Sequence, residues 1–202
     1  MTDGLYMERD AARAILASAR TQFLEKGYEK ASLRKICAEA GVTTGALYFS
    51  FKNKEALFEA LVAPTMEKLD AIMADLQVRV MEQNGETFDE KAFNDFMFDF
   101  LIENRDDIRL LTSRAEGSQY EGFYEKIRRY VETLMTHYAT KVAGVPIESQ
   151  LIGILTNMYF AAVSDLMGQE NTPDELNRMA DALRVVMETG FAAMLEHQKA
   201  EG

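Results

Sequence analysis

The sequence predicts an all-α protein of about nine helices, with a small three-helix domain at the N-terminus and a larger helical domain after it. Three observations support this fold class. The 202-residue chain contains only three prolines, it lacks the long alternating runs of β-strands, and residues that favour helix starts recur along it. We expect the two domains to cover residues 1–54 and 55–202.

The first four helices are predicted from apolar periodicity and from capping residues. Ser32, Thr43 and Asn53 each have a side chain that can accept a hydrogen bond from a helix's first backbone N–H groups. Gly27 is expected to end the first helix. The predicted helices cover about residues 10–25, 33–40, 43–49 and 54–81.

Later helix starts are marked by capping boxes, in which a Ser or Thr precedes a Glu by three residues. Such boxes stand at Thr87–Glu90, Ser118–Glu121 and Thr172–Glu175, and the last of them has a proline at the first helical position. Pro146, after Gly144, is expected to open a further helix.

Charge is distributed unevenly along the chain. The whole protein has a net charge of −11, but residues 1–54 carry 9 basic and 6 acidic residues, whereas residues 55–202 carry 13 and 27. A mildly basic first domain and a strongly acidic second domain suggest different partners, although chance and a solvated acidic face would also give this pattern. Cys37 stands alone, so no internal disulfide can form and a reducing compartment is expected.

Residues 32–51, SLRKICAEAGVTTGALYFSF, have the pattern of a helix-turn-helix, two short helices joined at Gly41-Val42. The second helix of this motif can enter the DNA major groove while apolar residues hold it on its scaffold. An ordinary three-helix core with a solvated polar face is the alternative. The residues expected to face inward are Leu33, Ile36, Cys37, Ala40, Val42, Leu47 and Phe51.

Four groups of residues stand together within residues 15–61. They are Phe23-x-x-x-Gly27-Tyr28, Ser32-Leu33-Arg34-x-Ile36-Cys37, Ala40-Gly41-Val42, and Leu47-Tyr48-Phe49-x-Phe51-x-x-Lys54-Glu55-x-Leu57. In this combination they resemble the DNA-binding domain of the tetracycline-repressor (TetR) family. The remainder of the chain resembles the family only in length and helical layout.

The resemblance implies a role for each matching position. The residues implied to face bases or their methyl groups are Arg34, Thr43, Thr44, Gly45 and Phe49. The residues implied to hold phosphates are Ser32, Tyr48 and Lys54. Ser50 stands where many family members carry histidine, and because serine reaches less far, a DNA contact from this position stays open.

Two apolar stripes, along residues 151–166 and 176–195, are broader than one internal contact needs. Two DNA-binding domains that bind half-sites about 34–36 Å apart require a two-fold dimer, and in the family the last two helices form an intersubunit bundle. A purely internal helix pair is the alternative. The residues predicted for the dimer interface are Leu155, Tyr159, Leu183, Met187 and Phe191.

Methionine and aromatic residues are frequent between these two regions, and such side chains suit an apolar ligand. Family members usually hold an effector here, although the same residues could simply fill a core. The acidic charge favours a cationic or lipophilic ligand over an anionic one. The predicted ligand-binding residues are Met66, Phe96, Phe100, Arg114, Tyr124 and Asn157.

No catalytic or metal-binding pattern is evident, because His137 and His197 lack partners at metal-ligand spacing. We therefore expect neither an enzyme nor a cofactor or metal. The sequence also lacks an apolar run close to the roughly 18 residues of a membrane span. We expect a cytoplasmic homodimer that binds double-stranded operator DNA and a small effector, most simply a repressor that the effector releases from a palindromic operator. A ligand-binding or adaptor dimer without DNA contacts is the alternative, and activation in place of repression stays open.

Overall fold

The computed structural model describes residues 2–82, 89–142, 144–145, 147–169 and 171–201. Over these ranges the chain forms nine α-helices and two short π-helical turns and contains no strand, which confirms the all-α prediction. The elements are α1 (Thr2–Lys30), α2 (Leu33–Glu39), α3 (Thr44–Ser50), α4 (Lys54–Gln77), η1 (Val78–Glu82), α5 (Glu90–Glu103), α6 (Arg105–Ser113), α7 (Phe123–His137), η2 (Tyr138–Val142), α8 (Ser149–Gly168) and α9 (Pro173–Glu201).

The chain divides into two compact units. The head unit comprises Met1–Glu67 and Asp106–Tyr124, and the body unit comprises Lys68–Arg105 and Glu125–Gly202. Helix α4 therefore begins in the head unit and ends in the body unit. The boundary predicted after residue 54 separates an expected DNA-binding domain from an expected ligand-binding and dimerisation domain. This division by role stays a prediction.

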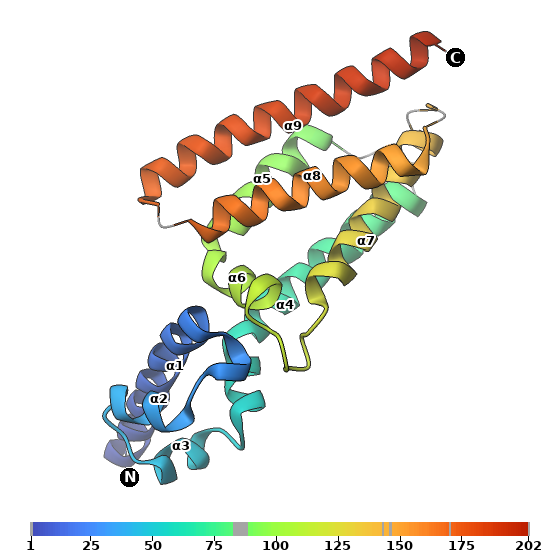
Figure 1. Cartoon of the computed structure of the whole chain (residues 1–202). Helices are drawn as coiled ribbons and strands as arrows, with labels where there is room; N and C mark the ends of the chain where they lie inside the picture. Colours follow the sequence, from blue (N-terminus) through green and yellow to red (C-terminus); the bar gives the residue numbers. More distant parts are fainter. Residues whose placement is uncertain (1, 83–88, 143, 146, 170, 202) are drawn as a thin grey trace. The chain divides into compact units, whose positions relative to one another are not determined.

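The head unit has one core, in which α2 and α3 pack against α1 (Figure 1). Ile15, Phe23, Ile36 and Leu47 are completely buried in it. The ring of Phe23 also meets that of Phe58 from α4 edge-on, with centroids 5.1 Å apart. Because helices of seven residues are not stable alone in water, this packing is what keeps α2 and α3 helical.

The turn between α2 and α3 depends on Gly41, whose φ of 67° lies in the left-handed region. The backbone N–H of Val42 donates to the carbonyl oxygen of Cys37 at 3.0 Å and so closes the end of α2. At Gly27 the φ and ψ angles are 77° and 163°, so α1 is interrupted there, as the sequence predicts, although helical turns continue to Lys30.

The predicted helix starts agree with the structure at several positions. The Asn53 side chain accepts from the N–H of Ala56 at 2.8 Å, and Thr172 and Glu175 form the reciprocal bonds of a capping box before α9. The box predicted at Ser118 does not begin a helix, because Glu121 accepts from Gly117 within a turn and α7 begins only at Phe123. No helix start is predicted from the sequence where α6 begins, at Arg105. Thr87, Phe88 and Pro146 lie outside the described residues.

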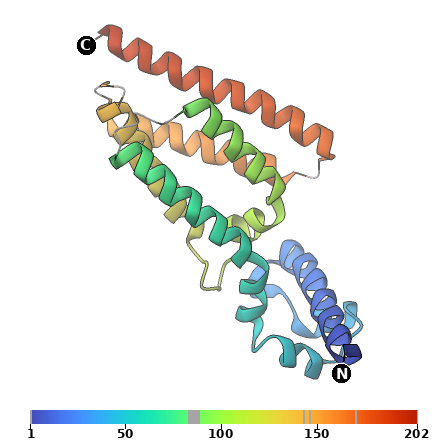
Figure 2. The same cartoon turned by 180° about the vertical axis from the view of Figure 1, so that it is seen from behind.

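In the body unit α5 and α8 lie along α9 (Figures 1 and 2). Their shared core contains Phe98 of α5, Met167 of α8 and Leu176 of α9. Beside it, the Arg184 guanidinium of α9 donates to the Asp95 carboxylate of α5 at 2.6 Å. Charged side chains thus border the apolar contact between α5 and α9.

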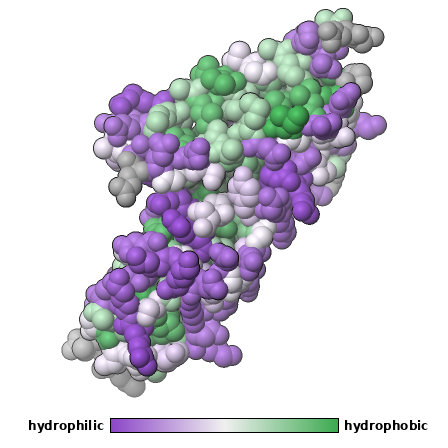
Figure 3. Space-filling model, in the orientation of Figure 1, coloured by the Kyte–Doolittle hydropathy of each residue, from purple (hydrophilic) through white to green (hydrophobic). Residues whose placement is uncertain are grey.

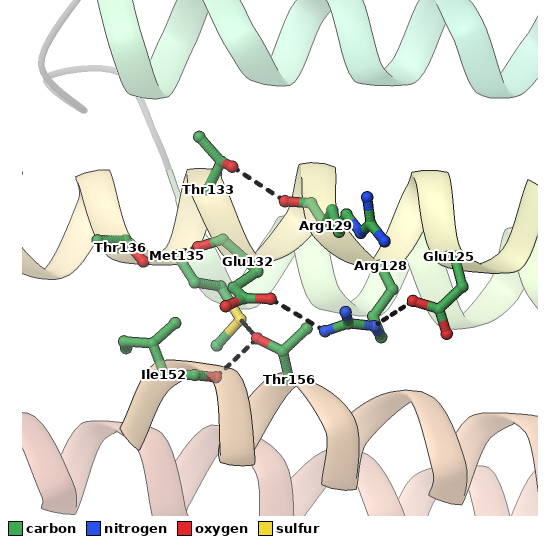
Figure 4. A network of polar contacts seen from close by, with 9 residues as sticks. All are labelled: Glu125, Arg128, Arg129, Glu132, Thr133, Met135, Thr136, Ile152 and Thr156. Carbon is green, nitrogen blue, oxygen red and sulfur yellow. Dashed lines mark hydrogen bonds and ion pairs between the residues drawn. The ribbon is translucent and has the colours of Figure 1, made fainter. Parts of the chain in front are cut away.

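Polar contacts join α7 and α8 (Figure 4). Arg128 pairs with Glu132 at 2.9 Å on α7, and the fully buried Thr156 of α8 donates to the carbonyl oxygen of Ile152 at 2.9 Å and to the Met135 sulfur at 3.5 Å. A Cβ atom on Gly153 would lie 3.2 Å from Glu132 Oε1. The absence of a side chain at residue 153 therefore lets the two helices approach closely.

Candidate nucleic-acid interface

Helix α3 has a buried side and an exposed side. Leu47 is completely buried in the head core, whereas Thr44, Gly45, Tyr48 and Phe49 are exposed. The exposed fractions of the two aromatic residues are 54% for Tyr48 and 76% for Phe49. The helix therefore presents small and aromatic side chains to its surroundings, which is the surface that a helix in a major groove needs.

Two of the predicted DNA contacts also cap helices. The Thr43 hydroxyl oxygen accepts from the backbone N–H of Ala46 at 3.2 Å, and that of Ser32 accepts from the N–H of Lys35 at 3.4 Å. A hydroxyl is both an acceptor and a donor, so the cap leaves its proton available for another acceptor. Each residue can thus contribute to helix stability and to a phosphate or base contact.

Lys54 has a role inside the protein. Its ammonium group donates to the carbonyl oxygen of Glu29 at 2.9 Å and lies 4.7 Å from the centroid of the Tyr28 ring. Burial lowers the pKa of Lys54, while the nearby Glu29 opposes this shift. The side chain connects the end of α1 to the start of α4, and an ammonium has three donors, so a phosphate contact stays compatible with this position.

Arg34 is exposed at the start of α2, and Ser50 is exposed at the end of α3. Of the eight residues predicted to bind DNA, seven are therefore exposed and Lys54 is half-buried. Their contacts with DNA stay predictions.

The residues predicted to bind a ligand belong to both units. Met66, Arg114 and Tyr124 lie in the head unit, where Met66 packs against the core and Arg114 Nε is buried without a hydrogen-bond partner among the described residues. The body unit holds the buried Phe100 and the exposed Phe96 and Asn157. Their assignment to one ligand site stays a prediction.

The residues predicted for the dimer interface mostly contact their own chain. Tyr159 and Leu183 pack against the core of α5, α8 and α9, and Phe191 packs against a second body core. Other apolar residues of the same two helices are exposed, and Figure 3 shows hydrophobic surface gathered over α8 and α9. These exposed residues are Ile154 and Met158 of α8 and Met179, Val185 and Val186 of α9.

Among the described residues, α8 is the one helix long and apolar enough to cross a membrane by length and composition, although no such run is expected from the sequence. Only 22% of its most apolar window is buried within the chain. The high hydropathy has a structural explanation, because Ile152 and Val163 face the body core while Ile154 and Met158 are exposed.

The comparison with known proteins decides the family. The family model described as bacterial regulatory proteins, tetR family, matches residues 15–61, which include all of α2 and α3. Residues 15–61 therefore match the tetR family. This family consists of regulatory proteins and not of enzymes.

One curated relative of the chain is the HTH-type transcriptional repressor Rv1474c of Mycobacterium tuberculosis. It is 40% identical over 60 residues, which cover 30% of this chain and 32% of the relative. The chain spans less than half the length of the curated relatives that it matches first.

Two solved structures share the fold. A TetR family transcriptional regulator from Chloroflexus aurantiacus has a TM-score of 0.62 and 15% identity, with 94% of this chain and 93% of that chain covered. A gamma-butyrolactone receptor (ArpA like protein) has a TM-score of 0.59 and 19% identity, with 95% and 99% covered. At these identities the likeness concerns the fold alone.

Tyr28 connects three parts of the head unit. Its backbone N–H donates to the carbonyl oxygen of Arg114 at 2.8 Å, and its phenol donates to Glu55 at 2.5 Å. Glu55 also accepts from the backbone N–H of Gln119 at 2.8 Å. The segment after α6 is thereby bonded to the end of α1 and to the first turn of α4. The resemblance to the tetR family included Tyr28 and Glu55, but no local pattern of residues indicates their hydrogen bonds to Arg114 and Gln119, more than sixty positions away.

Asp107 connects three helices in the same unit. Its carboxylate forms an ion pair with Arg20 of α1 and accepts a hydrogen bond from Thr65 of α4 at 2.7 Å. Thr65 is 2% exposed and the Asp107 side chain 13%, so both oxygens of a largely buried carboxylate have partners. Helix α6 is thus held to both helices that support the helix-turn-helix.

The Tyr28 phenol gives a prediction about stability and pH. Burial and the hydrogen bond to Glu55 raise the pKa of Tyr28 from 10.0 to about 12. The unfolded chain therefore loses this proton at a lower pH than the folded protein does. The stabilisation is complete below about pH 10 and declines as the pH rises from 10 towards 12.

Tyr28→Phe is expected to lower the free energy of unfolding at pH 8 by about 1–3 kcal/mol, because it removes a hydrogen bond to a carboxylate. The difference from the unmodified protein should shrink between pH 10 and 11 in urea unfolding followed by circular dichroism. Tyr48→Phe, at an exposed ring, serves as the control and should change this free energy by less than about 0.5 kcal/mol. A difference for Tyr28→Phe that stays constant up to pH 11 would contradict the assignment.

Proposed function

We propose that this protein is a homodimeric, DNA-binding regulator of transcription that acts in the cytoplasm. Its simplest form is a repressor that a small, largely apolar effector releases from a palindromic operator. The observation that carries the proposal is the exposed side of α3, where Phe49 and Tyr48 project from a helix whose other side is buried. The matched family and the relative named a transcriptional repressor support it.

Direct selection of DNA tests the proposal. The full-length protein, incubated with a pool of random duplexes, is expected to enrich a palindromic site whose half-sites lie about 34–36 Å apart, one helical turn of DNA. Combined replacement Arg34→Ala and Lys54→Ala should weaken binding and reduce its dependence on salt, because fewer counterions are released. Glu116→Ala, at an exposed acidic position, is the control. Failure to enrich any palindromic site would refute the proposed function.

The exposed apolar face of α8 and α9 supports the dimer. Met158 and Val186 are 59% and 65% exposed, and adjacent exposed residues on these helices are also apolar. Large contiguous apolar patches on soluble proteins mark surfaces that another molecule covers. We assign this face to a second copy, because two-fold recognition of a palindrome requires one.

Replacing both Met158 and Val186 by Glu should give a monomer, because a dimer would have to bury unpaired carboxylates. Sedimentation velocity at micromolar concentration measures the change, and the circular dichroism spectrum should stay helical. Asn177→Glu, at an exposed position of α9 about 160–180° around the helix from Met179 and Val186, should leave the dimer intact. If the doubly substituted protein still sediments as a dimer, another surface holds the two copies together.

An effector is supported by the fold shared with a gamma-butyrolactone receptor and by the Met and aromatic residues of the ligand-binding prediction. Ligand binding changes DNA affinity only through different affinities for two conformations of the protein. The segment after α6 is suited to link ligand binding to DNA binding. Its residues Arg114 and Gln119 form hydrogen bonds with Tyr28 of α1 and Glu55 of α4, the two helices that support the helix-turn-helix.

A thermal-shift screen with matched lipophilic, cationic and carboxylate compounds tests the effector. Lipophilic or cationic compounds are expected to raise the melting temperature and to lower operator affinity by roughly 5–150-fold. Phe100→Ala should reduce the shift in melting temperature for the same compound. Stabilisation by carboxylates alone would contradict the proposed chemistry of the effector.

A further inference from the structure

Glu39, the last residue of α2, is bonded to α1 through both of its carboxylate oxygens. The Ser18 hydroxyl donates to Oε2 at 3.0 Å, and the Gln22 amide donates to Oε1 at 3.1 Å. Because Ser18 and Gln22 lie one turn apart on the same side of α1, a single carboxylate spans two successive turns of that helix. Gln22 is only 2% exposed, so one of the two donors comes from the interior of the head unit.

Apolar contacts also join these two helices. In the head core, α1 contributes Phe23 and α2 contributes Ile36 and Cys37. Apolar burial is non-directional, so it holds two helices together without fixing how one is rotated on the other. Hydrogen bonds, by contrast, require a short distance and a near-linear angle. The two bonds to Glu39 therefore define how the end of α2 is oriented on α1.

A carboxylate at residue 39 has no local advantage. A negative charge at the C-terminal end of a helix interacts unfavourably with the helix dipole. Residues 1–54 also carry an excess of basic residues, and a carboxylate does not help such a domain to bind a polyanion. Lys35, one turn earlier, lies 3.6 Å from Glu39 Oε1, but exposed ion pairs of this kind contribute little. The bonds to α1 thus explain the glutamate.

The place of Glu39 in the chain connects these bonds to α3. Only residues 40–43 separate the end of α2 from the start of α3. That turn has a defined geometry, with Gly41 at a φ of 67° and the N–H of Val42 bonded to the carbonyl oxygen of Cys37. A rotation of the end of α2 would therefore be passed on to α3.

We propose that Glu39 is a positioning residue for operator recognition, and that its bonds to Ser18 and Gln22 set the orientation in which α3 meets DNA. This inference rests on the proposed DNA binding and gives Glu39 a role without any contact to DNA. Binding to random DNA depends on charge and tolerates a change in this orientation. Binding to the operator depends on it, because base edges are read only in one register.

The test measures the affinity of the full-length protein for the selected operator and for a random-sequence duplex at one salt concentration. Glu39→Asp keeps the charge but withdraws the carboxylate by one methylene. It should lower the ratio of the two affinities about ten-fold, the equivalent of one hydrogen bond to a charged group. Ser18→Ala removes one donor while favouring the helix, and should lower the ratio about three-fold. The double variant should be no worse than Glu39→Asp alone, because both changes break the same bond.

A purely structural role for Glu39 gives a different result. Loss of folded protein lowers both affinities by the same factor and leaves their ratio unchanged. Lys35→Ala, which removes only the exposed ion pair with Glu39, is the matched control and should also leave the ratio unchanged. An unchanged ratio in Glu39→Asp, or in Ser18→Ala if Glu39→Asp does not fold, would overturn the inference and leave the proposed DNA binding intact. A selection that enriches no DNA would overturn both.

Discussion

The head unit depends on the burial of one side of α2 and α3 against α1. Ile36, Cys37 and Leu47 exclude water together with Phe23, and two helices of seven residues gain from this contact the stability that they lack alone. The same contact fixes which side chains of α3 stay exposed. Folding therefore uses one side of this short helix, and the proposed DNA binding uses the opposite side.

Polar contacts then join this core to the rest of the head unit. Tyr28 and Glu55 bond to the segment after α6, and Asp107 joins α6 to α1 and α4. Both Asp107 and Glu55 accept from more than one donor, so each carboxylate holds several elements in one arrangement. Residues 106–124 consequently belong to the same compact unit as the helix-turn-helix, although they follow it by more than fifty positions.

Features set by short-range contacts could be predicted from the sequence, and features set by long-range contacts could not. The caps at Asn53 and Thr172 involve residues three positions apart, so a local pattern identified them. The apolar stripes of α8 and α9 were evident as well, but their period does not tell which half faces the chain's own core. Helix α5 covers one side of α8 alone. Tyr159 therefore packs inward, whereas the preceding residue, Met158, is exposed.

Thr43 has a consequence for how this protein could change its DNA specificity. Its hydroxyl caps α3, so most replacements would weaken this helix at the same time as they alter the base contact that the family resemblance implies for Thr43. Thr44 and Phe49 are exposed and take no part in the cap. Under the proposed DNA binding, new operators are therefore more accessible by evolution through these two positions, while residue 43 is constrained to the few side chains that can both cap a helix and contact DNA.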